Sequence, residues 1–142
     1  MFELHPQLAR DTLPVGRFPL CELRLMNDAN YPWFILVPRR EGLREIHELS
    51  ESDLFLLMHE SVVLSRALTL LFKPNKLNIA ALGNVVPQLH VHHIVRYEKD
   101  PAWPAPVWGK LPGVPYMPAR IDELRGKLQE TLTRVAFEPE PR

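Results

Sequence analysis

The sequence is poor in cysteine and has no excess of charge of either sign. Cys21 is the only cysteine among 142 residues, so no intrachain disulfide can form and nothing indicates an oxidising compartment. Seventeen basic residues balance seventeen acidic ones, which removes the electrostatic argument for binding to nucleic acid or to a membrane surface. Residues 1–6 lack the basic and then apolar layout of a signal peptide, and no apolar run approaches the roughly 20 residues of a membrane span. We therefore expect a cytoplasmic protein that binds neither nucleic acid nor a membrane.

The composition is otherwise that of a folded globular domain. Hydrophobic residues make up 46% of the chain and charged residues 24%, which excludes an intrinsically disordered protein. A chain of this length can form one domain with a real core. Fifteen prolines are many for 142 residues, and they crowd into a few stretches such as residues 100–109, where we expect no regular structure.

Hydrophobic periodicity predicts several strands and two helices. Ser50, with Asp53 three residues later, is typical of a helix start, and Pro74 should end that helix. Strands are expected over residues 21–26, 33–37, 76–82 and 87–97, the first two as an antiparallel hairpin, and a last helix from Pro118. Residues 1–19 show little periodicity beyond one short helical turn near residues 6–10, and residues 138–142 should fray. This order predicts an α+β architecture, an antiparallel sheet of about five strands with a long helix and a C-terminal helix packed on it.

Three of the six histidines lie within four residues, in the predicted strand 87–97. Side chains alternate between the two faces of a strand, so Gln88, His90 and His92 share one face and His93 lies on the other. Neighbouring imidazoles on a strand suit a nucleophile, a proton shuttle or a metal ligand, and they can also be purely structural. A zinc site usually needs three or four ligands, and the remaining histidines, His5, His47 and His59, show no supporting spacing.

The segment around these histidines resembles the signature of the histidine triad (HIT) superfamily, Gly-Gln-x-Val-x-His-x-His-x-His followed by apolar residues and often an arginine. The positions that match directly are Gly83, Val86, His90 and His92. Asn84 replaces the glutamine conservatively, Arg96 corresponds to the downstream arginine, and Gln88 stands where the first histidine is expected. The alternative register, with His90 first, puts Ile94 at the third position and misaligns the other matches.

The resemblance extends upstream and covers roughly residues 20–97. Residues 27–40 look like the Asp-x-x-Pro segment of the superfamily and its following Leu-Val-x-Pro-Lys strand, and Asn78 stands where an asparagine often precedes the triad. Residues 100–109 look like a branch of bacterial HIT-like proteins. The implied organisation is a HIT-like nucleotide-binding domain over residues 1–110 and a C-terminal helical extension over residues 111–142.

The resemblance implies an enzyme that cleaves or transfers a nucleoside monophosphate group and that is commonly a homodimer. The middle histidine, His90, would attack the α-phosphorus and form a nucleotidyl-histidine, and His92 would contact phosphate oxygens or protonate the leaving group. The implied substrate-binding residues are Gln88, Asn84, Asn78, Asp28 and Asn27. This chemistry requires no metal or other cofactor, and the implied ligand is a nucleotide or a nucleotide conjugate.

Gln88 is the departure from the superfamily pattern. A glutamine can form hydrogen bonds but cannot titrate, so no proton transfer can pass through the first position of the triad. Three hypotheses follow: a phosphoramidase, hydrolase or nucleotidyltransferase, a nucleotide-binding module without turnover, and a metal-binding protein that uses His90 and His92.

Overall fold

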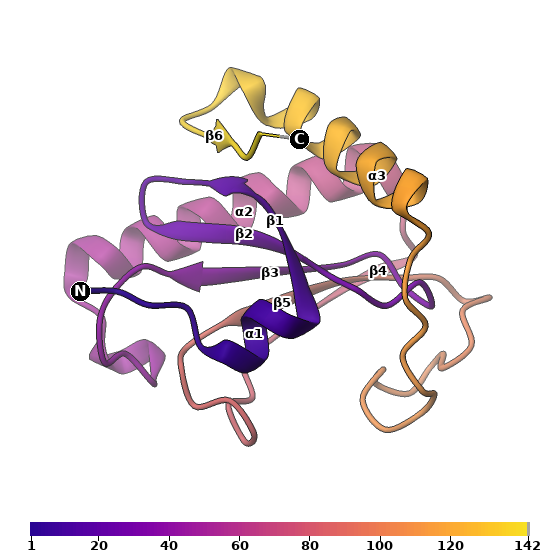
Figure 1. Ribbon diagram of the computed structural model, residues 1–142, viewed down its shortest axis with the longest axis horizontal. Helices are drawn as coiled ribbons and strands as arrows, with labels where there is room; N and C mark the ends of the chain where they lie inside the picture. The colour runs from indigo at the N-terminus through magenta and orange to yellow at the C-terminus, as the bar shows by residue number, and fades with distance from the viewer. Residues whose placement is uncertain (142) are drawn as a thin grey trace.

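The computed structural model describes residues 1–141, which form one six-stranded antiparallel sheet with helices on its two faces (Figure 1). The helices are α1 (Pro6–Asp11), α2 (Glu51–Phe72) and α3 (Pro118–Thr131), with 3-10 turns η1 (Ile46–Glu48) and η2 (Leu132–Arg134). The strands are β1 (Thr12–Arg17), β2 (Cys21–Met26), β3 (Trp33–Pro38), β4 (Lys76–Ala80), β5 (Val91–Arg96) and β6 (Glu138–Pro139). They lie in the order β4-β5-β3-β2-β1-β6. The predicted α+β architecture is confirmed, with six strands instead of about five.

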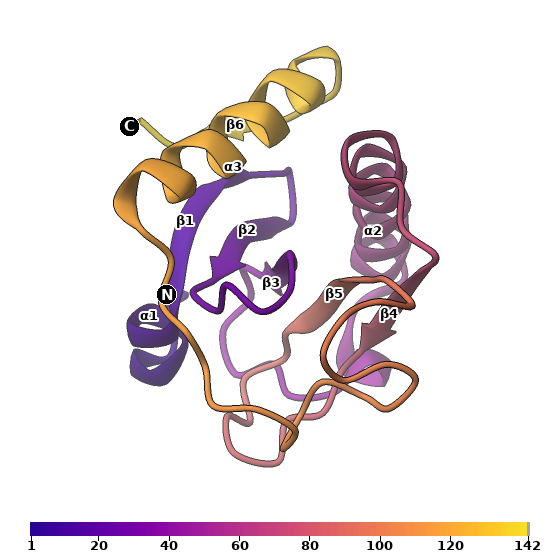
Figure 2. The ribbon, with the colours of Figure 1, turned by 90° about the vertical axis from the view of Figure 1, so that its right-hand side faces the viewer.

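The long helix begins and ends where its sequence predicts. The Ser50 side chain accepts a hydrogen bond from the Asp53 N–H, which caps the first turn of α2. The helix ends at Phe72, and Lys73 takes the left-handed conformation directly before Pro74. α2 covers the inner face of the sheet, and α1 lies on the opposite side (Figure 2).

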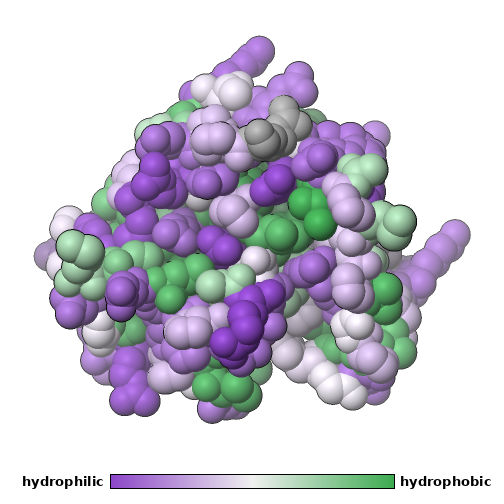
Figure 3. Space-filling model, viewed as in Figure 1, coloured by the Kyte–Doolittle hydropathy of each residue, from purple (hydrophilic) through white to green (hydrophobic). Residues whose placement is uncertain are grey.

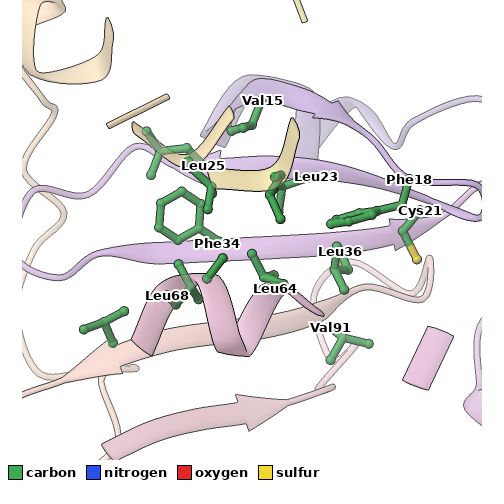
Figure 4. Close-up of a cluster of buried hydrophobic side chains, with 14 of the residues drawn as sticks. Val15, Phe18, Cys21, Leu23, Leu25, Phe34, Leu36, Leu64, Leu68 and Val91 are labelled. Carbon is green, nitrogen blue, oxygen red and sulfur yellow. The ribbon is translucent and has the colours of Figure 1, made fainter. Parts of the chain in front are cut away.

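The main hydrophobic core lies between the sheet and the two longer helices. Leu64 and Leu68 of α2 meet Phe34 and Leu36 of β3 in this cluster, and Leu128 of α3 belongs to it as well (Figure 4). All five of these side chains are fully buried. Burial of a leucine or phenylalanine side chain contributes about 1.5–3 kcal/mol each to the free energy of folding, so this face carries much of the stability.

One helix, α2, is long and apolar enough to cross a membrane when only length and composition are considered. This result does not contradict the sequence-based expectation, which concerned uninterrupted apolar runs, because His59, Glu60 and Ser61 interrupt the apolar residues of α2. The same test is met by helices that pack inside a folded domain, and α2 packs on the sheet through Leu57, Leu64 and Leu68.

The two ends of the chain contribute structure that periodicity did not predict. β1 and β6 pair with each other through Gly16 and Pro139, and β1 also pairs with β2. Gly16 is required at this point because a Cβ there would overlap the Phe137 ring and the Glu138 carbonyl. The expectation that residues 138–142 fray is wrong for β6. The predicted extension, residues 111–142, and the rest of the chain share one core.

The histidine strand is shorter than predicted. β5 comprises Val91–Arg96 instead of residues 87–97, because its pairing with β3 begins at the Leu36–Val91 pair and its pairing with β4 reaches only to Ala80–His92. The backbone before Val91 turns away from the sheet, and the Leu89 N–H donates to the Leu43 carbonyl. His90 therefore directly precedes the strand, whereas His92 and His93 lie within it.

Irregular segments cover the outer face of the sheet. A second cluster forms there between strand residues such as Ile35 and Ile94, Leu8 of α1, and Ala102 and Val107 from the segment after β5. The surface of the molecule in Figure 3 shows apolar areas separated by polar ones. Because His90 and His92 lie on this side, the covering segments determine what can reach them.

Arg96 anchors one of these covering segments from inside the protein. Its guanidinium is 1% exposed and forms a bidentate ion pair with Asp100, at 2.8 and 3.1 Å. It also donates to the Asn78 side-chain oxygen at 2.7 Å and to the Ala105 carbonyl at 2.8 Å. The Trp103 ring lies over the guanidinium at 5.6 Å. The segment after β5 is thereby tied to the sheet although it contains no helix or strand.

Candidate functional site

The three clustered histidines divide between the two faces of the sheet as strand alternation predicts. The rings of His90 and His92 lie edge to face, with their centroids 4.8 Å apart, on the outer side. His93 lies on the inner side, where its Nε2 and the Ser61 hydroxyl of α2 are 2.7 Å apart and its Nδ1 is 3.1 Å from the Val91 carbonyl oxygen. Both nitrogens of His93 are therefore satisfied by the protein, whereas the outer pair retains free nitrogens.

The hydrogen bond of His90 determines which of its nitrogens can react. Its Nδ1 lies 2.7 Å from the Gln88 carbonyl oxygen, and a carbonyl oxygen can only accept. The proton of the neutral imidazole therefore lies on Nδ1, and Nε2 carries the lone pair. Burial lowers the pKa of His90, while the bond to Gln88 opposes this change and the charge of His5 adds to it. A neutral imidazole with a free Nε2 is suited to nucleophilic attack.

His92 is in the opposite tautomer. Trp33, the first residue of β3, donates its indole N–H to Nδ1 of His92 over 3.0 Å, so Nδ1 carries the lone pair and the proton lies on Nε2. Burial lowers the pKa of His92 to about 3, with further contributions from His90 and His93. His92 is thus a neutral hydrogen-bond donor at physiological pH. The two adjacent imidazoles present one acceptor and one donor.

An aromatic wall surrounds His92. Trp108, from the segment after β5, lies edge to face with both His92 and Trp33, at centroid distances of 5.1 and 5.6 Å. Trp33 and His92 are almost completely buried, whereas Trp108 is 36% exposed. Both tryptophans of residues 100–109 hold this segment against the sheet, Trp108 against Trp33 and His92, and Trp103 over the Arg96 guanidinium. The role of Trp33 has no sequence signal, because the hydrogen bond joins residues 59 positions apart.

Gln88 has a different position from the one that a simple strand predicts. Its side-chain oxygen accepts from the His5 N–H at 2.9 Å and its side-chain nitrogen donates to the Glu3 carbonyl at 2.8 Å. The amide therefore holds the N-terminal segment, and the backbone carbonyl of the same residue orients His90. Asn84 lies exposed in the turn that follows Gly83. Contact of either side chain with a ligand stays a prediction.

The other predicted binding residues are tied to the protein itself. Asn78 accepts from Arg96, and Asn27 accepts from the Tyr116 N–H at 2.9 Å. One Asp28 oxygen accepts from the N–H groups of Asn30 and Val114. These side chains hold the covering segments in place, and no contact in the described residues brings them to the two imidazoles. Their contact with substrate also stays a prediction.

A cavity of about 470 Å³ opens beside His90. It is lined by His90, Gln88 and Leu89, by residues 81–83 after β4, by residues 44–47 around η1, and by Leu54 of α2. Its walls are largely apolar, with Arg44 and His47 among the polar groups. Nothing in the spacing of the sequence connects His47 with His90, and the cavity brings the two histidines to a common wall. A cavity with apolar walls and a few polar groups is typical of a small-molecule site.

Within residues 1–141, no group of three or more histidine, cysteine, aspartate or glutamate side chains is placed to hold a metal ion. In addition, Nδ1 of His90 and Nδ1 of His92 already form hydrogen bonds with the protein. The described site therefore offers at most two imidazole nitrogens to a metal, fewer than the three protein ligands of a typical zinc site.

The chain is similar to proteins whose structures are known. The HIT domain profile matches residues 8–99. A histidine triad protein from Marinobacter aquaeolei is 53% identical, with a TM-score of 0.93, over 96% of this chain and 99% of that one. A histidine triad protein from Bradyrhizobium japonicum is 45% identical, with a TM-score of 0.90, over 92% of this chain and 97% of that one. A third, from Sinorhizobium meliloti, is 42% identical, with a TM-score of 0.91, over 93% and 98%.

No protein with a curated function matches the sequence. The profile match covers more than half of the chain, and the three related structures are similar over nearly its full length. They also share the antiparallel sheet and helices described above. The chain therefore belongs to the HIT family.

Proposed function

We propose that the protein is a nucleotide phosphoramidase or hydrolase, or a nucleotidyltransferase, that acts at the α-phosphate of a nucleotide through a nucleotidyl-histidine. The observation that carries this proposal is the hydrogen bond from His90 Nδ1 to the Gln88 carbonyl, which leaves the Nε2 lone pair for attack. The lowered pKa of His90 keeps this nitrogen unprotonated at neutral pH. Covalent catalysis then divides one difficult displacement at phosphorus into two easier ones.

His92 supports the same reaction as a donor. Its Nε2–H lies on the imidazole next to His90, where a phosphate oxygen bound for attack would gain a hydrogen bond. The cavity beside His90 can hold another part of the nucleotide conjugate, with apolar side chains for a flat group and Arg44 for a polar one. The proposed amide donors to the phosphate are Asn84 and the second N–H of Gln88, whose first N–H donates to Glu3. Asn78, Asp28 and Asn27 remain the proposed contacts to the rest of the nucleotide.

The test is the covalent intermediate itself. After brief incubation with adenosine or guanosine 5′-phosphoramidates and 5′-phosphoanhydrides, mass spectrometry should find the added nucleotidyl mass on the peptide with residues 88–97. The His90→Asn variant keeps a donor for the Gln88 carbonyl but has no nitrogen at the Nε2 position. We expect it to lose the adduct and at least about a thousandfold of the turnover. Unchanged turnover in this variant would exclude the proposed mechanism.

A binding module without turnover is the second candidate, and the position of Gln88 favours it. A residue that cannot titrate holds the first triad position, and both atoms of its amide are used by the N-terminal segment. In this case nucleoside monophosphates would raise the thermal unfolding temperature in proportion to the logarithm of their concentration. No substrate would then produce an adduct.

We also propose that the protein is a homodimer. β4 is the edge strand next to β5, and several apolar side chains of the neighbouring helix α2 are exposed: Phe55 (70%), Met58 (62%) and Leu70 (69%). A groove along α2 connects Met58 and Leu70 with Ile79 of β4. A second copy would cover both the helix face and the free strand edge. Light scattering should give twice the chain mass, and Met58→Glu should give a folded monomer.

A further inference from the structure

Trp33 and His92 form a buried pair whose hydrogen bond has a direction. The indole N–H can only donate, so the 3.0 Å contact requires a lone pair on Nδ1 of His92. Both side chains are at most 6% exposed, and Trp108 packs against both rings. Protonation of Nδ1 would place two N–H groups against each other where water cannot enter to separate them, which is costly.

We infer that Trp33 makes His92 a permanent neutral donor, so that the site accepts nucleotides whose leaving group departs without a proton from His92. This inference rests on the proposed function and narrows it. The substrate class is a nucleotide joined at its α-phosphate to an acidic group, such as a phosphate, a carboxylate or an acidic phenol. Amides of nucleotides, whose amine must gain a proton before it leaves, would be poor substrates.

The other residues at the triad positions do not supply a proton to the leaving group either. Gln88 occupies the first triad position and cannot titrate, and His90 serves as the nucleophile with its proton held on Nδ1 by the Gln88 carbonyl. The titratable groups that act on His92 are His90 and His93, and a positive charge on either would further disfavour protonation of His92. One other histidine, His5, influences His90, and its Nδ1 accepts from the Gln7 N–H as the cap of α1.

Both displacements at phosphorus can proceed without a general acid. In the first step the Nε2 lone pair of His90 forms a bond to phosphorus, and the bond from phosphorus to the leaving oxygen breaks, with the electron pair leaving on that oxygen. His92 donates a hydrogen bond to a non-bridging phosphate oxygen and keeps its proton. In the second step water attacks phosphorus, the bond to His90 breaks and returns its electron pair to Nε2, and the proton of the water passes to the solvent.

The tautomer can be tested on the resting protein. We expect the imidazole ¹⁵N spectrum of wild-type His92 to show a protonated Nε2 and an unprotonated Nδ1 at every pH between 5 and 8. Trp33→Phe keeps an aromatic ring but removes the donor, and it should shift His92 to a mixture of the two tautomers. Trp108→Phe is the matched control, since it trims the other indole and leaves this hydrogen bond intact. A wild-type His92 with a proton on Nδ1, or one that titrates in this range, would overturn the inference.

The substrate class is tested with adenosine 5′-phosphate aryl esters whose phenols span three units of pKa. Without a general acid, adduct formation on wild-type His90 should slow by at least about a hundredfold from the most to the least acidic phenol. An equal rate across the series would show that the protein supplies a proton and would overturn the inference alone. A series that forms no adduct with any ester would instead overturn the proposed function, and the inference about substrates with it.

A variant of His5 tests whether this histidine supplies a proton to the leaving group. His5→Asn keeps an acceptor for the cap of α1 and removes the imidazole. The inference expects the same dependence on phenol acidity in this variant as in the wild type. The ratio of the rates for the most and the least acidic phenol could instead be at least tenfold larger in His5→Asn than in the wild type. That result would identify His5 as a general acid, and the restriction to acidic leaving groups would be wrong.

Discussion

The histidines on the two faces of the sheet differ in how many of their nitrogens form hydrogen bonds with the protein. On the inner face, His93 meets a regular helix, and its two nitrogens are paired with Ser61 and the Val91 carbonyl. On the outer face, His90 and His92 meet irregular segments, and Nδ1 of each forms a hydrogen bond with the protein. The residue type is the same throughout. Under the proposed function, what separates a structural histidine from a functional one is how many of its nitrogens the fold uses.

The two faces of the sheet are also covered by different kinds of structure. A helix satisfies its own backbone groups and can cover a sheet face with aliphatic side chains alone. The irregular cover on the outer face needs polar anchors, which Arg96, Asp100 and Gln88 supply. Gln88, one of these anchors, also lines the cavity beside His90, whereas His93 on the inner face is fully buried.

The largest expected effect on stability is at His93. His93→Ala removes a buried ring and leaves the Ser61 hydroxyl and the Val91 carbonyl without their partner, which should cost about 2–4 kcal/mol of the free energy of unfolding. For a chain of this size the unfolding temperature should fall by about 5–15 °C, as calorimetry can measure. Adduct formation on His90 should persist in the folded fraction. Ser61→Ala is the matched control, and it should cost only about 1 kcal/mol.

If His93→Ala abolished adduct formation while its unfolding temperature stayed within a degree of the wild type, the assignment of the two faces would be reversed. A structural role for His93 would then be excluded, although its side chain is fully buried.

An effect of similar size is expected from pH. Burial lowers the pKa of His93 to about 4 and that of His92 to about 3, whereas both groups titrate near 6.5 in the unfolded chain. Between these values the unfolded state binds more protons than the folded state, so stability is full above pH 7 and falls as the pH decreases through 6.5. Between pH 7 and pH 5 the loss should be about 2 kcal/mol for each histidine. Chemical denaturation at several pH values measures this slope.

His93→Phe separates the two contributions. The variant keeps a ring in the core and has no group to titrate, so its loss between pH 7 and pH 5 should be about 2 kcal/mol smaller than that of the wild type. An unchanged slope would mean that His93 does not contribute, and that its neutral form is not what the inner face requires.

Local patterns predicted the elements whose contacts lie near in sequence or repeat regularly. The Ser50 cap and Pro74 bracket α2, β2 and β3 carry strand composition, and alternation along β5 separates His93 from His92. The family signature over residues 83–92 placed His90 and His92 together. These inferences need only a period or a motif.

Long-range pairings were not predictable in the same way. β6 comprises only Glu138 and Pro139, and they pair with residues of β1 more than 120 positions away. The bond from Trp33 to His92 joins residues 59 apart, and the contacts of Gln88 reach residues 83 and 85 positions away. A single sequence contains no periodic signal for such contacts. The expectation that Gln88 shares a strand face with His90 was wrong because residues 87–90 find no partner strand, and the chain there turns toward the N-terminus.

The smallest predicted effect concerns the outer face and its N-terminal cover. Gln88→Ala removes both side-chain hydrogen bonds to residues 3–5 and should cost about 1–2 kcal/mol, less than His93→Ala, because these groups are partly exposed and water can replace the lost partners. Hydrogen exchange at the His5 amide should become faster, while exchange in β5 should not change. Gln88→Glu tests the direction of the bonds, since a carboxylate can still accept from His5 but cannot donate to Glu3. It should protect the His5 amide and still lose part of the stability. If exchange in β5 accelerated as well, the N-terminal segment would be part of the core and not a cover over the imidazoles, and the contrast between the two faces would have to be abandoned.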